Sequence, residues 1–119
     1  MASKNIIAEL NKGEKLNGDN YNIWHLKMHY VLEEQEVLEA INYVMDAPMA
    51  DEESVNLAQY RRDVAVYSAW KKNDSTARGI LISSMSDDLV VEYQQCPTAN
   101  AMWVTLREKY GGTTISKLR

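Results

Sequence analysis

The stretch from Glu52 to Ser84 constrains the fold more than any other part of this chain, because its apolar residues recur at helical spacing almost throughout. Two stripes follow one another: Leu57, Tyr60, Val64 and Tyr67, then Trp70, Ala77, Leu81 and Met85. Glycine and proline are scarce, strand-like alternation is short, and phenylalanine is absent, so the pattern predicts an all-α fold. Because helices beyond about 25 residues are unusual, we expect a kink or break near Lys71–Asn73.

The composition is that of a single ordinary globular domain. The chain has 119 residues, 45% hydrophobic and 25% charged, which suffices for one core without covalent staples. No apolar run approaches the ~18 residues that a membrane span needs, and the N-terminus lacks the layout of a signal peptide. Cys96 is the only cysteine, so an internal disulfide is impossible. These features predict an intracellular, cytoplasmic protein with no membrane partner.

The charge distribution argues against nucleic-acid binding by this segment. The net charge is −4, whereas affinity for phosphate backbones depends on clustered lysine and arginine. The basic residues form isolated pairs, Arg61-Arg62 and Lys71-Lys72, each with acids nearby. We therefore expect both pairs on solvated helix faces and no direct contact with RNA or DNA.

Four further helical segments are predicted. A helix from Tyr21 to Glu34 follows the turn pair Asn17-Gly18, with Asp19 or Asn20 as its cap. Its apolar residues spread over so wide an arc that burial on more than one side is expected. The pattern also predicts a short helical turn near residues 37–41 and a helix from Ser86 through Tyr93. The last predicted helix is capped by Thr98 and ends at a C′ glycine, Gly111.

Residue types that could support catalysis or metal binding are present but poorly arranged. His25, His29 and Glu33 share a helix face at four-residue spacing, yet no further ligand completes a metal site, so a solvated polar face is expected. Cys96 lacks a base with any sequence reason to lie nearby. No phosphate loop or nucleophile elbow is present. We expect no enzymatic activity, cofactor, metal or small-molecule substrate.

Asp74 is unusual because it lies within the apolar stripe between Trp70 and Ala77. A buried carboxylate needs a partner. Two partners remain open: an i,i+4 pair with Arg78, or a hydrogen bond to the end of a neighbouring helix. The tryptophans and most tyrosines are expected to be core aromatics, with the core built on five residues: Trp24, Trp70, Leu81, Trp103 and Leu106.

Three separated motifs occur in a particular order. They are "LNGDNYxxW" up to Tyr21 and Trp24, "WxxxDxxA" at Trp70, Asp74 and Ala77, and "TAxxMWxxLxxxYG" through Trp103, Leu106, Tyr110 and Gly111. Leu81 continues the second stripe. In this order and at these separations the motifs, covering roughly residues 14 to 119, make the chain resemble the Gag protein of copia-type LTR retrotransposons, the plant elements especially.

The resemblance implies a helical bundle of about four to six helices, like the N-terminal domain of retroviral capsid proteins. It implies residues 1–13 as an extension, 14–112 as the capsid N-terminal domain, and 113–119 as the start of a following helix. The implied function is that of a structural protein that self-assembles into a virus-like particle, with other Gag copies as partners. The alternative is a domesticated Gag-derived adaptor that binds a host protein or peptide.

Self-association is also expected from the residues themselves. The first helix is apolar over a wide arc, and Ile6, Ile7 and Leu10 add a short apolar stretch at the N-terminus. A module with such surfaces tends to cover them with a copy of itself. The alternative is that the first helix is the central helix of a monomeric bundle.

Overall fold

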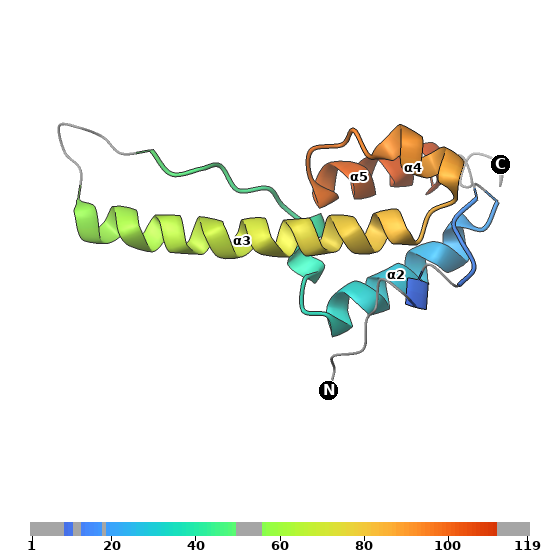
Figure 1. The fold of residues 1–119 in the computed structure, drawn as a ribbon, viewed down its shortest axis with the longest axis horizontal. Coiled ribbons are helices and arrows are strands. Elements are labelled where there is room, and N and C mark those ends of the chain that lie inside the picture. Colours follow the sequence, from blue (N-terminus) through green and yellow to red (C-terminus); the bar gives the residue numbers. More distant parts are fainter. Residues whose placement is uncertain (1–8, 11–12, 18, 50–55, 112–119) are drawn as a thin grey trace.

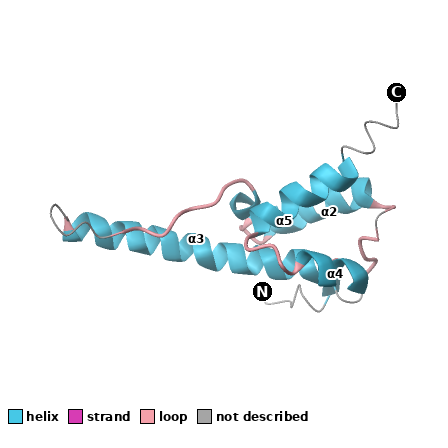
Figure 2. Ribbon diagram, turned by 90° about the horizontal axis from the view of Figure 1, so that it is seen from above, coloured by secondary structure: helices cyan, strands magenta, loops and turns pink. Residues whose placement is uncertain are grey.

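The computed structural model describes residues 9–10, 13–17, 19–49 and 56–111. Their elements run in this order: α2 (Tyr21–Glu34), the 3₁₀ helix η1 (Leu38–Ile41), α3 (Leu57–Ser83), α4 (Asp87–Tyr93), α5 (Ala99–Leu106) and the π-helical turn η2 (Arg107–Gly111). Figures 1 and 2 show this helical arrangement. The described part contains four α-helices and no sheet, only an isolated bridge between Leu16 and Met85. The prediction of an all-α fold is confirmed.

The core lies where α2, α4 and α5 meet the C-terminal half of α3. Trp24 and Trp103 are both buried, with ring centroids 5.7 Å apart, and they join α2 to α5. The other large side chains that are fully enclosed come from every element of this half: Leu16, Leu32, Ile80, Leu81, Tyr93, Met102 and Leu106. Trp70 is buried at the edge of the domain, outside this cluster.

α3 is a single unbroken helix of 27 residues. The predicted break near Lys71–Asn73 is wrong, because it rested on length alone. None of the common causes of a kink lies there, since no proline occurs in α3 and its one glycine is Gly79. The N-terminal half of α3 extends beyond the other helices (Figure 1). We call this half, residues 57–72, the arm.

α2 buries one face and exposes the opposite one. Its buried residues are Tyr21, Trp24, Met28 and Leu32. Ile23, Leu26 and Tyr30 lie on the other side and are 56%, 56% and 70% exposed. The prediction that α2 is buried on more than one side is therefore wrong for a single copy: both faces are apolar, but the described residues cover only one.

The end of α2 contains a left-handed residue that is not a glycine. Glu36 has φ 63°. Its amide donates to the Glu33 carbonyl and the Val37 amide donates to the Leu32 carbonyl, both at 3.0 Å. These are the two bonds of a Schellman motif, in which this position usually favours glycine.

The predicted C′ glycine at residue 111 has a different role. The chain continues from α5 into η2, so Gly111 is the last residue of a π-helical turn and does not follow the helix end. Its φ is outside the left-handed range. Tyr110 in the same turn stacks on Tyr21, with ring centroids 6.0 Å apart. The helical run therefore reaches Gly111 as predicted, but the prediction that Gly111 is a C′ glycine is wrong.

Candidate self-association surface and the motifs behind it

The first motif ties the segment before α2 to the C-terminal end of α3. The Leu16 amide donates to the Ser84 carbonyl at 2.8 Å, and the Ser86 amide donates to the Leu16 carbonyl at 3.0 Å. Lys15 Nζ donates to the Ser83 carbonyl at 2.7 Å. The bonds to Ser83 and Ser84 satisfy carbonyls that the C-terminal end of α3 leaves without partners within the helix. A cation at this end also suits the helix dipole.

Of the two predicted caps, Asp19 and Asn20, Asn20 occupies the N-cap position of α2, and its carbonyl accepts from the Trp24 amide at 2.9 Å, but its side chain does not cap the helix. The Asn17 amide donates to Asn20 Oδ1 at 3.1 Å, and Asn20 Nδ2 donates to the Lys15 carbonyl at 2.9 Å. The predicted capping by an Asn20 side-chain oxygen is therefore wrong. This side chain instead closes the loop that leads into the helix.

Trp24 connects this motif to α3. Its indole Nε1 donates to Ser84 Oγ at 2.8 Å, and Ser84 Oγ donates to the Leu81 carbonyl at 2.7 Å. Trp24 and Ser84 are both buried. The tryptophan therefore supplies both apolar area and a satisfied hydrogen bond to the core.

Asp74 of the second motif binds the beginning of the third. The Ala99 amide donates to Asp74 Oδ1 at 2.7 Å, and the Ala101 amide donates to Thr98 Oγ1 at 3.0 Å. The sequence left two partners open for Asp74, and in the structure its partner is the N-terminal end of α5. Arg78 donates instead to the Cys96 carbonyl at 3.1 Å. Asp74 and Thr98 together cap α5.

Two further residues of the second and third motifs hold the end of η1 and the segment that follows it. Trp70 Nε1 donates to the Tyr43 carbonyl at 3.3 Å, and Asn100 Nδ2 donates to the Ile41 carbonyl at 2.7 Å. Ala77 is fully buried. The motif residues of this part of the chain are thus engaged in building the domain.

His25 lies in an aromatic setting and not on a solvated face, so that prediction is wrong. Its ring centroid is 4.9 Å from that of Trp103, and its Nδ1 is hydrogen-bonded to the Tyr21 hydroxyl at 3.1 Å. Burial lowers the pKa of His25, and the nearby His29 and Arg107 lower it further. His29 is exposed, as predicted.

Two kinds of chemistry considered from the sequence, metal binding and thiol reactivity, can be compared with the described residues. No group of three or more His, Cys, Asp or Glu side chains among them could hold a metal ion. Burial raises the pKa of the half-buried Cys96 thiol, which disfavours the reactive thiolate. No helix in the described ranges is long and apolar enough to cross a membrane.

The exposed side of α2 is one of the apolar surfaces that the described residues leave uncovered; other exposed apolar side chains lie before and along the arm, at Tyr43, Val44, Met49, Leu57 and Val66. We call the exposed side of the helix the outer face of α2; its residues are Ile23, Leu26, Lys27, Tyr30, Glu33 and Glu34, and all of them are exposed. Ile23, Leu26 and Tyr30 follow one another at helical spacing, so they form one apolar stripe. Contiguous exposed apolar area of this kind is typical of an interaction surface.

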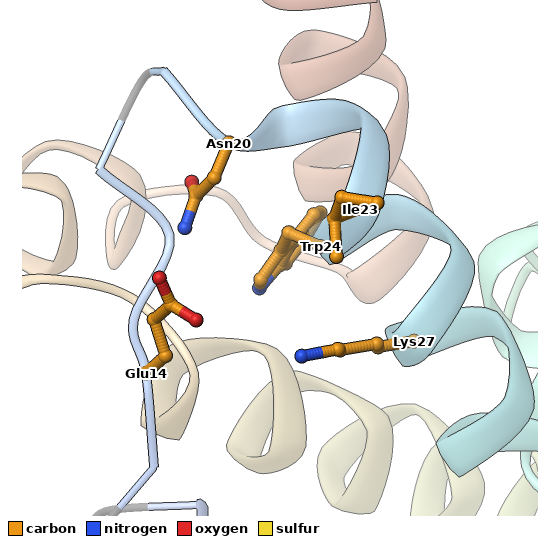
Figure 3. Close-up of a pocket in the computed structure, with 5 residues that line it drawn as sticks. All are labelled: Glu14, Asn20, Ile23, Trp24 and Lys27. Carbon is orange, nitrogen blue, oxygen red and sulfur yellow. The ribbon is translucent and has the colours of Figure 1, made fainter.

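A small hollow lies at the N-terminal end of the outer face. Its volume is about 130 Å³, and its lining residues are Glu14, Asn20, Ile23, Trp24 and Lys27. Figure 3 shows Glu14 and Lys27 extending into it from opposite sides, with Trp24 between them. One acid and one base of opposite charge leave the hollow nearly neutral, so it is not suited to a free anion or metal ion.

The residues expected to mediate self-association at the N-terminus are only partly visible. Leu10 is half-buried and packs against the core. Ile6 and Ile7 lie outside the described residues, as do residues 113–119 and most of the proposed extension 1–13. Their contribution to self-association stays a prediction.

Comparison with known protein families identifies the class. A family model described as the gag-polypeptide of LTR copia-type matches residues 28–118. The match runs from the middle of α2 through all the later helices and includes the second and third motifs. The chain belongs to this family. Comparisons with curated proteins and with solved structures gave no match.

Proposed function

We propose that this chain is a structural, non-enzymatic capsid domain of a copia-type Gag protein, and that it acts by binding copies of itself. The observation that carries the proposal is the exposed apolar stripe of Ile23, Leu26 and Tyr30 on α2. The family match supports the same function. The motif residues support it too, because Trp24, Asp74 and Trp103 are buried and serve the fold.

The apolar area of the stripe determines the binding free energy expected for one contact between two copies. Fully burying a large apolar side chain is worth about 1.5–3 kcal/mol. Three side chains that are already partly covered would contribute on the order of 3–4 kcal/mol by the same measure. A dissociation constant of 1 mM already corresponds to about 4 kcal/mol. A single contact through the stripe is therefore weak, as suits a shell whose subunits are held by many contacts at once.

Sedimentation velocity of the full chain from micromolar to millimolar concentration tests the proposal. We expect a concentration-dependent dimer or larger oligomer. Leu26→Asp with Tyr30→Asp should return the protein to a monomer, because a carboxylate would have to be desolvated in the contact. Val91→Asp, at an exposed valine of α4, is the matched control and should associate like the unmodified chain.

A single monomeric species of the unmodified chain over the whole range would contradict the proposal. So would equal loss of association in the Val91→Asp control, since this would show that the stripe has no special role. Circular dichroism of each variant separates loss of contact from loss of folding. The adaptor function stays an alternative, and a stoichiometric complex with a host protein in place of self-association would favour it.

A further inference from the structure

The arm is basic on the side that faces away from the rest of the molecule. Arg61, Arg62, Ala65, Ala69 and Lys72 recur at three- and four-residue spacing, so they share one helix face, and all five are exposed. We call this the outer face of the arm. It contains three cations and no acid.

Asp63, the acid of the arm, lies on the other side of the helix. Asp63 lines a pocket of about 260 Å³ with Val66 and three residues of the preceding segment, Met45, Asp46 and Pro48. Gln59 Nε2 donates to Asp63 Oδ1 at 2.8 Å, and Arg62 Nη2 donates to Gln59 Oε1 at 2.8 Å. Arg62 is thus connected to Asp63 through Gln59, whereas no ion pair among the described residues joins Asp63 to Arg61 or Lys72.

The outer face of α2 has the opposite balance. Beside its apolar stripe it has Glu33 and Glu34, and Glu36 follows the helix end; Lys27 is its one cation. Glu14 adds a further carboxylate at the adjoining hollow. Two helix faces of opposite charge, one of them apolar along its centre, are complementary in the way that steers specific association.

These two faces cannot meet within one copy. The inner face of α2 packs on the core at the C-terminal half of α3, so its outer face points away from α3. The arm is the other end of the same straight helix (Figure 1). An unkinked helix cannot fold its own N-terminal half back over α2.

An alternative two-fold contact of α2 against α2 brings like charges together. It places Glu33, Glu34 and Glu36 of two copies in one interface with only two lysines. Like charges at close range disfavour association. The arm of a second copy offers three cations and small side chains at Ala65 and Ala69, which let a bulky stripe approach closely.

We propose that the outer face of α2 in one copy binds the outer face of the arm in a second copy. The inference rests on the proposed self-association and names its two surfaces. Such a contact is head-to-tail, because each copy uses one surface to hold its neighbour and has the other surface left for a further copy. Contacts of this type close into rings or continue as open chains. The electrostatic share of the contact should weaken with salt.

Mixing two variants that cannot self-associate tests the head-to-tail geometry. The first, Leu26→Asp with Tyr30→Asp, lacks a working α2 surface but keeps its arm. The second, Arg61→Glu with Arg62→Glu, lacks a working arm but keeps α2. Each alone should be monomeric, with association at least tenfold weaker than in the unmodified chain. Mixed, they should form a 1:1 dimer and nothing larger, since one intact contact remains.

Reversing the charges on both proposed surfaces provides a second test, because association that is lost in each variant should return when the two variants are mixed. Glu33→Lys with Glu34→Lys should abolish self-association, and mixing this variant with Arg61→Glu/Arg62→Glu should restore oligomers because both contacts regain opposite charges. Lys71→Glu is the matched control for the arm: it reverses an exposed charge on the same helix, on the side near the Tyr67 ring. It should leave association within about twofold of the unmodified chain.

Three results would overturn the inference. If the Arg61→Glu/Arg62→Glu variant self-associates normally while the α2 variant does not, the proposed function stands and the arm is not the partner surface. If the two variants fail to form a 1:1 dimer, the contact is not head-to-tail. If the basic face binds a single-stranded RNA oligonucleotide with sub-micromolar, salt-dependent affinity and Arg61→Glu/Arg62→Glu removes this binding without changing association, the face serves nucleic acid instead.

Discussion

The Asp74 carboxylate accepts a hydrogen bond of 2.7 Å from the backbone amide of Ala99, and both residues are buried. The acceptor lies in α3 and the donor is the first residue of α5, so one side chain both orients a neighbouring helix and satisfies its N-terminus. This relationship connects the second and third sequence motifs physically. It also accounts for an acid within an otherwise apolar stripe.

Replacing Asp74 should destabilise the domain to an extent that depends on the acceptor. Asp74→Ala leaves the buried Ala99 amide without its partner, which costs about 1–3 kcal/mol. Asp74→Asn keeps an oxygen acceptor and loses only the charge at the helix N-terminus, so it should cost about 1 kcal/mol or less. Urea unfolding followed by circular dichroism measures both. Ser75→Ala, at the next and exposed position, should change stability little; an equal loss in all three variants would contradict the account.

Trp24 and Ser84 should show energetic coupling through the 2.8 Å bond between them. Trp24→Ala should cost about 3–5 kcal/mol, as for other large core side chains, and Trp103→Ala similarly. Ser84→Ala leaves the indole N–H unsatisfied and should cost about 1–3 kcal/mol. In the Trp24→Phe background the same serine change should cost clearly less. A double-mutant cycle measures this difference, and strictly additive effects would show that the bond contributes nothing.

His25 should make stability fall in mild acid. Its pKa in the folded state lies below the usual 6.5, mainly because of burial beside Tyr21 and Trp103, with the charges of His29 and Arg107 adding to the effect. The fold therefore favours the neutral ring. The stabilisation is complete above the unfolded pKa and is lost as pH falls through 6.5 toward the folded value.

The measurement is chemical unfolding at several pH values between about 7.5 and 5. The comparison is between variants, so that contributions shared by all of them cancel. His25→Gln should remove part of the dependence of unfolding free energy on pH in this window. His29→Gln, at an exposed position, should retain most of this dependence, because burial is the main cause of the lowered His25 pKa and the His29 charge is a smaller one. A slope that is unchanged in His25→Gln would refute the assignment. An NMR titration of the His25 ring gives the folded pKa directly.

Glu36→Gly should stabilise the protein. A left-handed backbone costs a residue with a Cβ about 1–2 kcal/mol, and glycine avoids this cost while losing about 0.5–1 kcal/mol of unfolded-state entropy. The net gain should be about 0.5–1 kcal/mol, seen as a higher melting temperature. Glu36→Ala is the control, since it removes the carboxylate but retains the strain. If alanine stabilised as much as glycine, the charge and not the backbone would be responsible.

Much of the fold could be predicted from local patterns. The helix over Tyr21–Glu34 matches its predicted bounds, the capping of α5 by Thr98 is confirmed, and the short helix closing at Tyr93 lies where expected. These features depend on spacing and on caps within a few residues of each other, so they are visible in sequence. The sequence left two possible partners for Asp74, Arg78 and the end of a neighbouring helix. It could not decide between them, because the position of α5 beside α3 depends on tertiary contacts.

Apart from the break expected in α3, which rested on helix length, the wrong predictions come from tertiary packing that local preferences do not reveal. Asn20 has the right chemistry for a cap, but its side chain turns back to the Lys15 carbonyl. His25 has a polar ring on a helix, yet Trp103 covers it. A Schellman bond joins the Val37 amide to the Leu32 carbonyl, and both residues are buried. The chain reversal that buries Val37 holds Glu36 in a left-handed backbone conformation, which a residue with a Cβ disfavours.

Because α3 is one unbroken helix, the stability of its arm affects the contact proposed between two copies. Its C-terminal half is held by the core, whereas the first turns of the arm depend chiefly on intrinsic helix propensity, which is marginal for short segments in water. Amide protons along this one helix should therefore exchange with solvent on a gradient, fastest near Leu57 and slowest near Leu81. In the contact proposed above, a second copy binds the arm only while the arm is helical. Ser68→Ala, which strengthens the helix, is therefore expected to tighten the proposed association, because it raises the fraction of copies whose arm is helical.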